Sequence, residues 1–428
     1  MNVKKVPFSK EQMQKIIEKY PTPFYIYDEK AIRDNAKKLY KAFSWVKGPN
    51  NSTFKNFFAV KACPNPYILK ILKEEGMGTD CSSLPELMLS EKVGITKEEI
   101  MFSSNDTPDE EFVKAKQLGA IINLDDISFI ERLEKAAVIP DLICFRYNPG
   151  PLKEGSEIIG NPVEAKYGLT REQIIKAYRI MKEKGVKRFG LHTMVVSNMT
   201  DVNYLIDTAK ILFELIVEVH EKVGIEFEFV NLGGGVGIPY KPEDKPVDYD
   251  VFSKGVKKYY DKLIVGNKLD PIRVVMECGR AITGPYGFLV MKARHVTHKY
   301  RDFVGADACS ANLMRPLLYG AYHHITVLGK ESQPRDHVYD VVGSLCENTD
   351  KLAVQRKLPE TEVGDILVQH DTGAHGHAMG FNYNGKLRSA ELLLRPDGKI
   401  LQIRRAETVD DYFSTLDFHG LKSFRRME

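Results

Sequence analysis

The sequence predicts an α/β fold, a (β/α)8 barrel followed by a mostly antiparallel β domain. Three observations support this. From residue 56 to about 285, short apolar runs alternate with amphipathic helical segments. Strands separated by helices indicate parallel βαβ units, and eight such runs are the number that closes a barrel rather than an open doubly wound sheet. Past Gly287 the chain changes to β-rich stretches separated by turn residues.

The eight predicted strands are short apolar runs bounded by turn or helix signals. They lie at 56–61, 77–82, 99–104, 120–125, 141–148, 189–196, 227–232 and 273–278. The clearest helical segments between them are 66–76, 108–119, 171–185 and 202–224, and residues 28–43 form the first barrel helix. We therefore expect the barrel domain to span residues 30–285.

The β domain is predicted from stretches with few helical periods. They lie at 288–300, 323–330, 337–344, 365–371 and 398–408. The segment 21–28, PTPFYIYD, is also strand-like and precedes the first barrel helix. We assign it to the same domain, which is then discontinuous and covers residues 1–29 and 286–428.

The composition excludes several classes of protein. Of 428 residues, 43% are hydrophobic and 28% charged, with a net charge of +3 and no basic block, so we expect no nucleic-acid partner. The N-terminus lacks an apolar signal region, and no run is long enough for a membrane span. Six scattered cysteines without a CxxC pair favour a reducing cytoplasm over disulfides or structural zinc. We interpret His375 and His377, in GAHGHAMG, as part of a tight loop and predict no metal site.

Lys61 closes the apolar stretch FFAVKA and is followed by Cys-Pro-Asn-Pro, which places it at the carboxyl end of a buried strand. An ammonium group removed from water has to find a partner or react, and such a lysine can form a Schiff base with an aldehyde cofactor. The alternative is a lysine that extends from the strand end into solvent.

Two further strand ends meet Lys61 at the same rim of the predicted barrel. Strand seven ends in Gly233, Gly234 and Gly235, where a barrel commonly holds a phosphate, although three glycines also suit a flexible turn. Strand eight ends in ECGR, with Glu277 and Arg280. An amine, an anion cradle and a carboxylate together fit pyridoxal 5'-phosphate (PLP). A carboxylate beside the pyridine nitrogen favours decarboxylation over racemisation, because it keeps the ring a strong electron sink.

Several ordered motifs resemble one known family. FFAVKACPNP, NLGGGVGIPY, ECGRAITGPYG, GSLCENTDKLA and GFNYNG are similar to motifs of the fold-type III PLP-dependent decarboxylases, closest to the diaminopimelate decarboxylases. The resemblance runs over nearly the whole chain and implies a head-to-tail homodimer with shared active sites. It makes Lys61 the Schiff-base lysine. The cofactor-binding residues that it implies are Ser197, Gly233, Gly234, Gly235, Glu277, Gly279, Arg280 and His375.

The resemblance also implies residues that bind the substrate. They are Arg280, Arg315, Tyr319, Glu347 and His375. Cys346 would protonate the reaction's carbanion, and Cys346 and Glu347 would come from the neighbouring subunit. The residues alone leave alternatives open. Arg315 precedes a proline and also suits a surface turn, and Cys346 also suits a buried small hydrophobic position.

The chain departs from the family at a few positions in its motifs. Met194 and Val196 replace a ring-stacking histidine and a glycine, and His375 replaces a tyrosine. Leu84 and Pro85 stand where relatives have glycines.

The leading prediction is decarboxylation of meso-2,6-diaminopimelate to L-lysine, and the alternative is a D-lysine or D-ornithine decarboxylase of the same family. A racemase is disfavoured by Glu277. A non-catalytic PLP-binding protein is disfavoured by the β domain and GSLCEN, because those proteins resemble the barrel alone.

Overall fold

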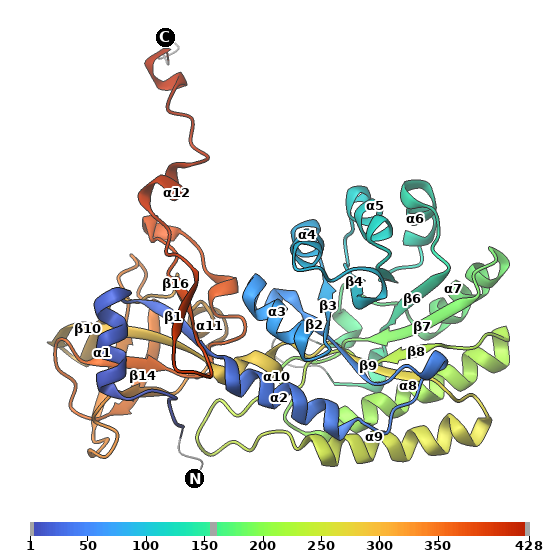
Figure 1. Ribbon diagram of the computed structural model, residues 1–428, viewed down its shortest axis with the longest axis horizontal. Helices are drawn as coiled ribbons and strands as arrows, with labels where there is room; N and C mark the ends of the chain where they lie inside the picture. Colours follow the sequence, from blue (N-terminus) through green and yellow to red (C-terminus); the bar gives the residue numbers. More distant parts are fainter. Residues whose placement is uncertain (1–3, 155–160, 424–428) are drawn as a thin grey trace. The chain divides into compact units, whose positions relative to one another are not determined.

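The computed structural model describes residues 4–154 and 161–423, and the chain divides into two compact units (Figure 1). The barrel unit is formed chiefly by Asp28–Gly287 and Gly373–Ala378. The β unit is formed by Lys5–Tyr27, Phe288–Thr372 and the residues from 379 onward. The domain limits predicted from the sequence, 30–285 for the barrel, stay a prediction.

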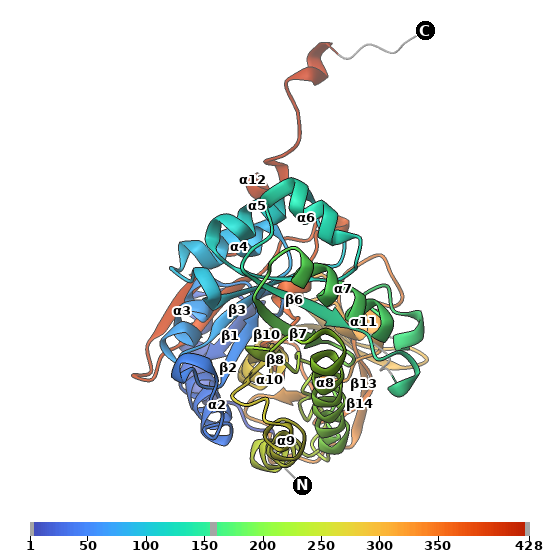
Figure 2. The same cartoon turned by 90° about the vertical axis from the view of Figure 1, so that its right-hand side faces the viewer.

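The barrel unit contains a closed ring of eight parallel strands, which Figure 2 shows from one end. The strands are β2 (Lys55–Ala59), β3 (Gly78–Cys81), β4 (Ile100–Ser103), β5 (Ile121–Leu124), β6 (Leu142–Tyr147), β7 (Arg188–Thr193), β8 (Phe229–Asn231) and β9 (Arg273–Met276). Each pairs with its neighbour in sequence, and β9 pairs with β2 to close the ring. The predicted (β/α)8 barrel is therefore confirmed, strand by strand.

Helices lie outside the ring. They are α2 (Glu29–Ala42), α3 (Pro66–Glu74), α4 (Leu84–Lys92), α5 (Asp109–Leu118), α6 (Phe129–Ala137), α7 (Arg171–Glu183), α8 (Val202–Val223), α9 (Tyr249–Leu263) and the short α10 (Arg280–Thr283). Local signals set their ends. Asp201 caps α8 by accepting a 2.9 Å hydrogen bond from the Asn203 N–H, and Gly224 ends it in the left-handed conformation (φ 67°). Among the described residues no helix is both long and apolar enough to span a bilayer.

The two ends of the barrel interior differ in chemistry. An apolar cluster fills one layer and consists of Phe57, Met101, Ile121, Leu142, Cys144, Phe229 and Val275. Buried polar residues occupy positions nearer the carboxyl ends of the strands, namely Asp80, Asn123, His192 and Asn231. A barrel core normally consists of packed aliphatic layers, so this polar layer marks the end where chemistry is expected.

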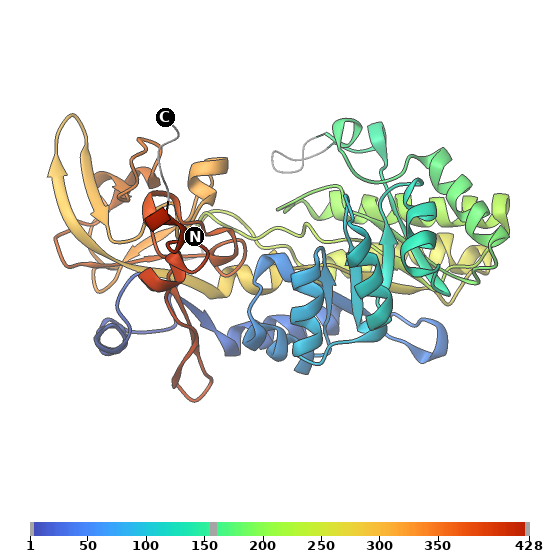
Figure 3. The same ribbon diagram turned by 90° about the horizontal axis from the view of Figure 1, so that it is seen from above.

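The β unit is built on a nine-stranded sheet whose main path runs β14-β13-β11-β10-β1-β16-β17, with β15 paired to β10 and β12. Its strands are β1 (Phe24–Asp28), β10 (Gly287–His298), β11 (Asp302–Ala306), β12 (Ile325–Val327), β13 (His337–Val342), β14 (Lys351–Leu358), β15 (Ile366–Gln369), β16 (Ala390–Leu394) and β17 (Ile400–Arg404). Its helices are α1 (Lys10–Lys19), α11 (Arg315–Tyr319) and α12 (Val409–Phe413). The long β10–β11 hairpin is the yellow-orange ribbon in Figure 3.

The predicted mostly antiparallel character is confirmed, with β11–β13 as a parallel exception. The segment 21–28 joins this sheet as β1, as expected. Phe24 and Ile26 of β1 pack in one core with Phe288 and Val290 of β10. The sequence-based assignment missed β11, β14 and β16.

Candidate active site

Lys61 lies directly after β2. The strand ends at Ala59, and Lys61 sits in the single 3-10 turn Val60–Ala62, so the prediction that it occupies the strand itself is wrong by two residues. Its neighbours Val60 and Ala62 are buried, whereas the lysine side chain is exposed. The expectation of an amine removed from water is therefore wrong for this structure. The turn presents the amine at the carboxyl end of the barrel.

The segment that carries Glu277 is fixed against the Lys61 turn. The buried Asn56 side chain of β2 accepts a 2.8 Å hydrogen bond from the Cys278 N–H and donates one of 3.0 Å to the Cys278 carbonyl. A Cβ atom on Gly279 would lie 2.8 Å from the Ala62 Cβ. Only glycine permits this approach, which brings the ends of β2 and β9 together.

The glycine turn after β8 packs tightly between two strand ends. Gly233 has φ 71°, and a Cβ there would meet the Thr193 carbonyl oxygen at 2.1 Å. A Cβ on Gly234 would lie 2.6 Å from the Glu277 carbonyl oxygen. Both residues are buried, and the turn continues into Gly235. These contacts require glycine at each place, so the turn is a built element and not a loose connection.

Arg280 links the ends of β7 and β9. Its guanidinium donates to the Tyr240 hydroxyl and, at 3.2 Å, to the Ser197 hydroxyl, and the residue is 8% exposed. The family motif's Ser197 and Arg280 therefore share one contact beside the glycine turn. A hydroxyl, a guanidinium and glycine backbone together are groups suited to binding a phosphate.

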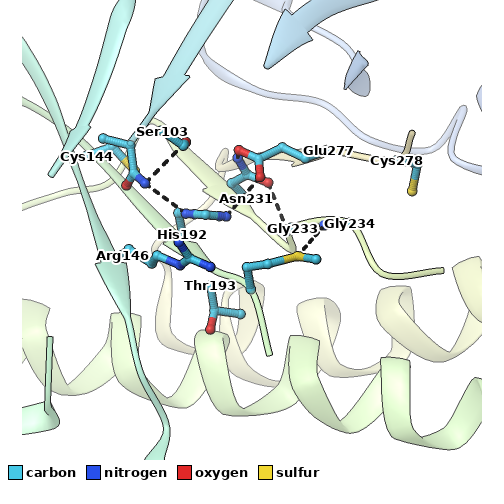
Figure 4. A network of polar contacts seen from close by, with 12 residues as sticks. Ser103, Cys144, Arg146, His192, Thr193, Asn231, Gly233, Gly234, Glu277 and Cys278 are labelled. Atoms are coloured by element: carbon cyan, nitrogen blue, oxygen red, sulfur yellow. Dashed lines mark hydrogen bonds and ion pairs between the residues drawn. The ribbon is translucent and has the colours of Figure 1, made fainter. Parts of the chain in front are cut away.

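Glu277 is buried and held by two neighbours, as Figure 4 shows. Its Oε2 lies 3.0 Å from His192 Nε2, and its Oε1 accepts a 2.7 Å hydrogen bond from the Asn231 amide. Burial by itself raises the pKa of this carboxyl, but His192, Asn231 and the charge of Arg146 together hold it below its ordinary value. Glu277 is therefore ionised at neutral pH.

The pKa of Asp80 is shifted in the opposite direction from that of Glu277. Burial raises the pKa of Asp80 well above its ordinary value, and the charge of Glu277 raises it further against the opposing effect of Lys61. Its Oδ1 has no hydrogen-bond partner among the described residues. Two carboxyls of one site with pKa values moved apart carry different protonation states. Asp80 keeps its proton, and Glu277 keeps the negative charge.

His375 belongs to the barrel unit rather than to the β unit that precedes and follows it in sequence. Its N–H donates a 2.8 Å hydrogen bond to the Ala62 carbonyl, next to Lys61, and its backbone is left-handed (φ 55°). The tight loop predicted for this region is consistent with that conformation. No cluster of three or more metal-ligating side chains occurs among the residues whose side chains the structure describes, 4–154 and 161–421.

Met194, the residue in place of the family's stacking histidine, faces the glycine turn. Its Sδ accepts a 3.3 Å hydrogen bond from the Gly234 N–H. Val196 is buried, and its carbonyl oxygen would lie 2.3 Å from a Cβ on Gly235. Met194 and Val196 therefore both lie against the glycine turn. Leu84 and Pro85 lie in the first turn of α4.

In the β unit, Arg315 begins α11 and is 3% exposed, so the alternative of a surface residue is wrong. Its guanidinium donates a 2.7 Å hydrogen bond to His323 Nε2. Because a guanidinium only donates, Nε2 accepts, and the His323 Nδ1–H donates to the His370 carbonyl at 2.9 Å. The contact therefore orients Arg315 without neutralising its charge. Tyr319, at the end of α11, is 40% exposed.

Cys346 and Glu347 lie together in the turn between β13 and β14. Cys346 is the exposed member of the six cysteines, so the alternative of a buried hydrophobic position is wrong. Its N–H donates a 2.8 Å hydrogen bond to the Asn384 side chain. Glu347 accepts a 3.0 Å hydrogen bond from the Tyr383 hydroxyl. Two residues of the motif GFNYNG therefore hydrogen-bond to Cys346 and Glu347 of GSLCEN.

The structure adds site residues that the sequence-based analysis did not name. Asp80, Asn123, Arg146 and Asn231 all lie at or near the carboxyl ends of barrel strands. Asn231 holds both Glu277 and, at 2.9 Å, the Gly233 N–H. The signal available in the sequence was a polar residue near the end of each predicted strand, which points to the site only after the barrel end is known.

Comparisons with known proteins show the family to which this chain is similar. A family model described as "Pyridoxal-dependent decarboxylase, pyridoxal binding domain" matches residues 30–284. Protein TabA of Pseudomonas amygdali pv. tabaci is 42% identical over 405 residues, covering 95% of this chain and 93% of that protein. The diaminopimelate decarboxylase of Methanothermobacter thermautotrophicus is 34% identical and covers 92% of both chains.

A solved structure shares the whole fold. The crystal structure of the M. jannaschii diaminopimelate decarboxylase in complex with L-lysine has a TM-score of 0.86 and 28% identity, with 94% of both chains covered. The match of the family model to more than half of the chain, with relatives aligned along nearly all of it, shows that this protein belongs to the pyridoxal-dependent decarboxylases and is a PLP-dependent amino-acid decarboxylase.

Proposed function

We propose that the protein decarboxylates meso-2,6-diaminopimelate to L-lysine, as a homodimer with shared active sites. The observation that carries the proposal is the alignment of diaminopimelate decarboxylases along more than nine-tenths of the chain, at 34% identity for one of them. The TabA relative carries no substrate in its name and is more similar, at 42%. The substrate therefore needs direct measurement.

The barrel residues fit PLP. The exposed amine of Lys61 suits the cofactor's aldehyde, and the tightly packed glycine turn with Ser197 and Arg280 suits its phosphate. The ionised, buried Glu277 suits a protonated pyridine nitrogen. When bound, PLP supplies an electron sink for the electron pair left by departing carbon dioxide. A carboxylate holds that ring proton more firmly than a neutral partner, which favours decarboxylation over racemisation.

Two buried guanidiniums support a dicarboxylic substrate. Arg280 and Arg315 are 8% and 3% exposed, and guanidinium binds carboxylate through two parallel hydrogen bonds. We assign Arg315 and Tyr319 to the substrate carboxylate that stays, and Glu347 to the distal ammonium. His375 would contact both cofactor and substrate from its position beside Ala62.

The D-lysine and D-ornithine decarboxylases remain the second candidate. The observation that favours them is the altered wall of the site, where Met194 contacts Gly234 and His375 replaces a tyrosine. A substrate that lacks the distal carboxylate leaves one guanidinium unmatched, which disfavours this candidate if both arginines face the substrate.

A substrate panel separates the two. We expect meso-diaminopimelate to exceed D-lysine, D-ornithine and L-ornithine in kcat/KM by about 10³-fold or more, since a site built for a polar group rejects analogues that lack it. Carbon dioxide release gives the rate, and chiral chromatography of the remaining substrate detects racemisation. Preference for a D-monocarboxylic diamine would replace the leading substrate, and racemisation without carbon dioxide would contradict the reaction itself.

Substitution of Cys346 tests whether this residue acts in the reaction at the shared site. Cys346→Ala should lower turnover by about 10²-fold while cofactor content stays at the wild-type level, because a proton donor acts on the reaction and not on binding. Cofactor absorbance and carbon dioxide release measure the two quantities. Cys309→Ala is the matched control, since Cys309 is buried in the same unit and packs against Ala311 and Leu345. Equal loss of cofactor and turnover in Cys346→Ala would make it a structural residue.

Subunit mixing extends this test. Lys61→Ala and Cys346→Ala place their defects in the same site of a mixed dimer if Cys346 is contributed by the partner, which leaves the other site intact. Unfolding and refolding an equimolar mixture should then restore about a quarter of the wild-type activity, because half of the dimers are mixed and each has one intact site. Activity no higher than that of the separate variants would contradict shared sites.

A further inference from the structure

A chain of polar contacts crosses the barrel interior and ends on Glu277. The Asn123 amide nitrogen lies 3.3 Å from the Ser103 hydroxyl and 3.0 Å from His192 Nδ1. His192 Nε2 lies 3.0 Å from Glu277 Oε2 (Figure 4). Asn123 and His192 are 3% and 1% exposed. The contacts join β4, β5 and β7 to the residue that follows β9.

The direction of these contacts fixes the form of the imidazole. An amide nitrogen can only donate, so His192 Nδ1 accepts the hydrogen bond from Asn123. A neutral imidazole with a free lone pair on Nδ1 carries its hydrogen on Nε2. That hydrogen is on the nitrogen that faces Glu277. The ring is thereby held in one tautomer.

We infer that Asn123 is a positioning residue that holds His192 in the neutral Nε2–H form and thereby keeps the full negative charge of Glu277 available at the site. This inference rests on the proposed role of Glu277 as the pyridine partner. In this form, His192 at Oε2 and the Asn231 amide at Oε1 would both contact the carboxylate as neutral groups. An imidazolium at the same place would form an ion pair with the carboxylate and compete with the cofactor's ring nitrogen for its charge.

An amide and a carboxylate at position 123 would act differently on the imidazole. The carboxylate nearest in sequence, Asp125, directly follows β5, is buried and makes a 3.2 Å ion pair with Arg146 of β6. An aspartate in place of Asn123 would differ by only one atom type, yet it could only accept from Nδ1 and would favour a doubly protonated ring. The amide is therefore the side chain of this size that both fills the space and prevents that protonation.

The wild-type holoenzyme gives the first test without any substitution. Protein labelled with 15N in the histidine rings is studied by solid-state NMR, and the His192 signals are assigned by their loss in His192→Gln. We expect one protonated and one unprotonated ring nitrogen, with Nε2 protonated. Two protonated nitrogens would mean that the Asn123 oxygen faces the ring, and this result would overturn the inference.

Two variants complete the test. Asn123→Asp should give a His192 ring with both nitrogens protonated and a turnover about 10- to 100-fold lower, the usual cost of losing a residue that orients a site group. Cys144→Ala is the packing control, because Cys144 is the cross-strand partner of Asn123 in β6 and makes no contact in this chain of polar groups. We expect it to keep the wild-type ring signals and turnover.

The outcomes distinguish a failure of the role inferred for Asn123 from a failure of the role proposed for Glu277. Unchanged ring protonation or unchanged turnover in Asn123→Asp would overturn the role of Asn123, and so would an equal loss in Cys144→Ala. If Asn123→Asp does not fold, Asn123→Ala replaces it, and both tautomers of His192 should then appear. If Glu277→Gln keeps full turnover, the role of Glu277 fails, even where the NMR signals show the expected tautomer.

Discussion

Lys61→Ala should lower turnover by about 10²- to 10⁴-fold, the range that a positioned amine contributes when it exchanges protons and bonds with the reacting group. The physical reason for this loss is the position of the amine in the turn after β2. The turn Val60–Ala62 presents this amine between two buried residues, and Ala62 packs against Gly279, which follows Glu277 by two residues. Carbon dioxide release under saturating substrate measures the loss.

A chemical label identifies the same residue independently of rate. Borohydride reduction of the wild-type holoenzyme should leave the cofactor covalently attached to Lys61, as peptide mass spectrometry would show. Lys55 is a matched control in the same strand region, since it lies in β2 and pairs with Glu99. A label on Lys55 or on no lysine would contradict the assignment, whatever the activity of Lys61→Ala.

Glu277→Gln should lower turnover by about 10²- to 10³-fold, comparable to the loss of one preorganised electrostatic partner in other enzymes. The expected cause is charge, because glutamine keeps the shape and the contact with Asn231 but has no negative charge to hold a protonated ring nitrogen. Carbon dioxide release measures turnover, and the visible spectrum of the bound cofactor reports the ring's protonation.

Asp80→Asn is the matched control for that substitution. Burial raises the pKa of Asp80, so the acid is protonated at neutral pH, and asparagine is its neutral equivalent in size and shape. We expect Asp80→Asn to keep most of the wild-type turnover. A loss as large as that of Glu277→Gln would show that Asp80 is ionised in the working enzyme, contrary to the effect of its buried position.

Much of the fold could be predicted because the barrel strands are short, buried and apolar. All eight were located from such runs, and each lies within a few residues of the observed strand. Two of the strands that were missed, β11 and β14, lack this signal. In β14 charged and apolar residues mix around a bulge at Gln355 (φ 45°), and β11 contains Gly305 in only five residues.

The site was predictable where a motif follows a strand and not where a single side chain points into the barrel. Lys61, the glycine turn and Glu277 stand in recognisable segments. Asn123 and His192 are 69 residues apart and meet only through the register of β5, β6 and β7. Asp80 is one polar residue in a buried run. Its protonation depends on Glu277, which no local pattern in the sequence connects to it.

The short segment Gly373–Ala378 has a consequence for protein engineering. It packs with the barrel although the chain on both sides of it belongs to the β unit, and the His375 N–H binds the Ala62 carbonyl beside Lys61. A chimera that joined this barrel at residue 287 to the second half of a relative would therefore import the donor's residue at position 375. Recombination at residue 287 would exchange the segment Gly373–Ala378 of the barrel unit together with the β unit.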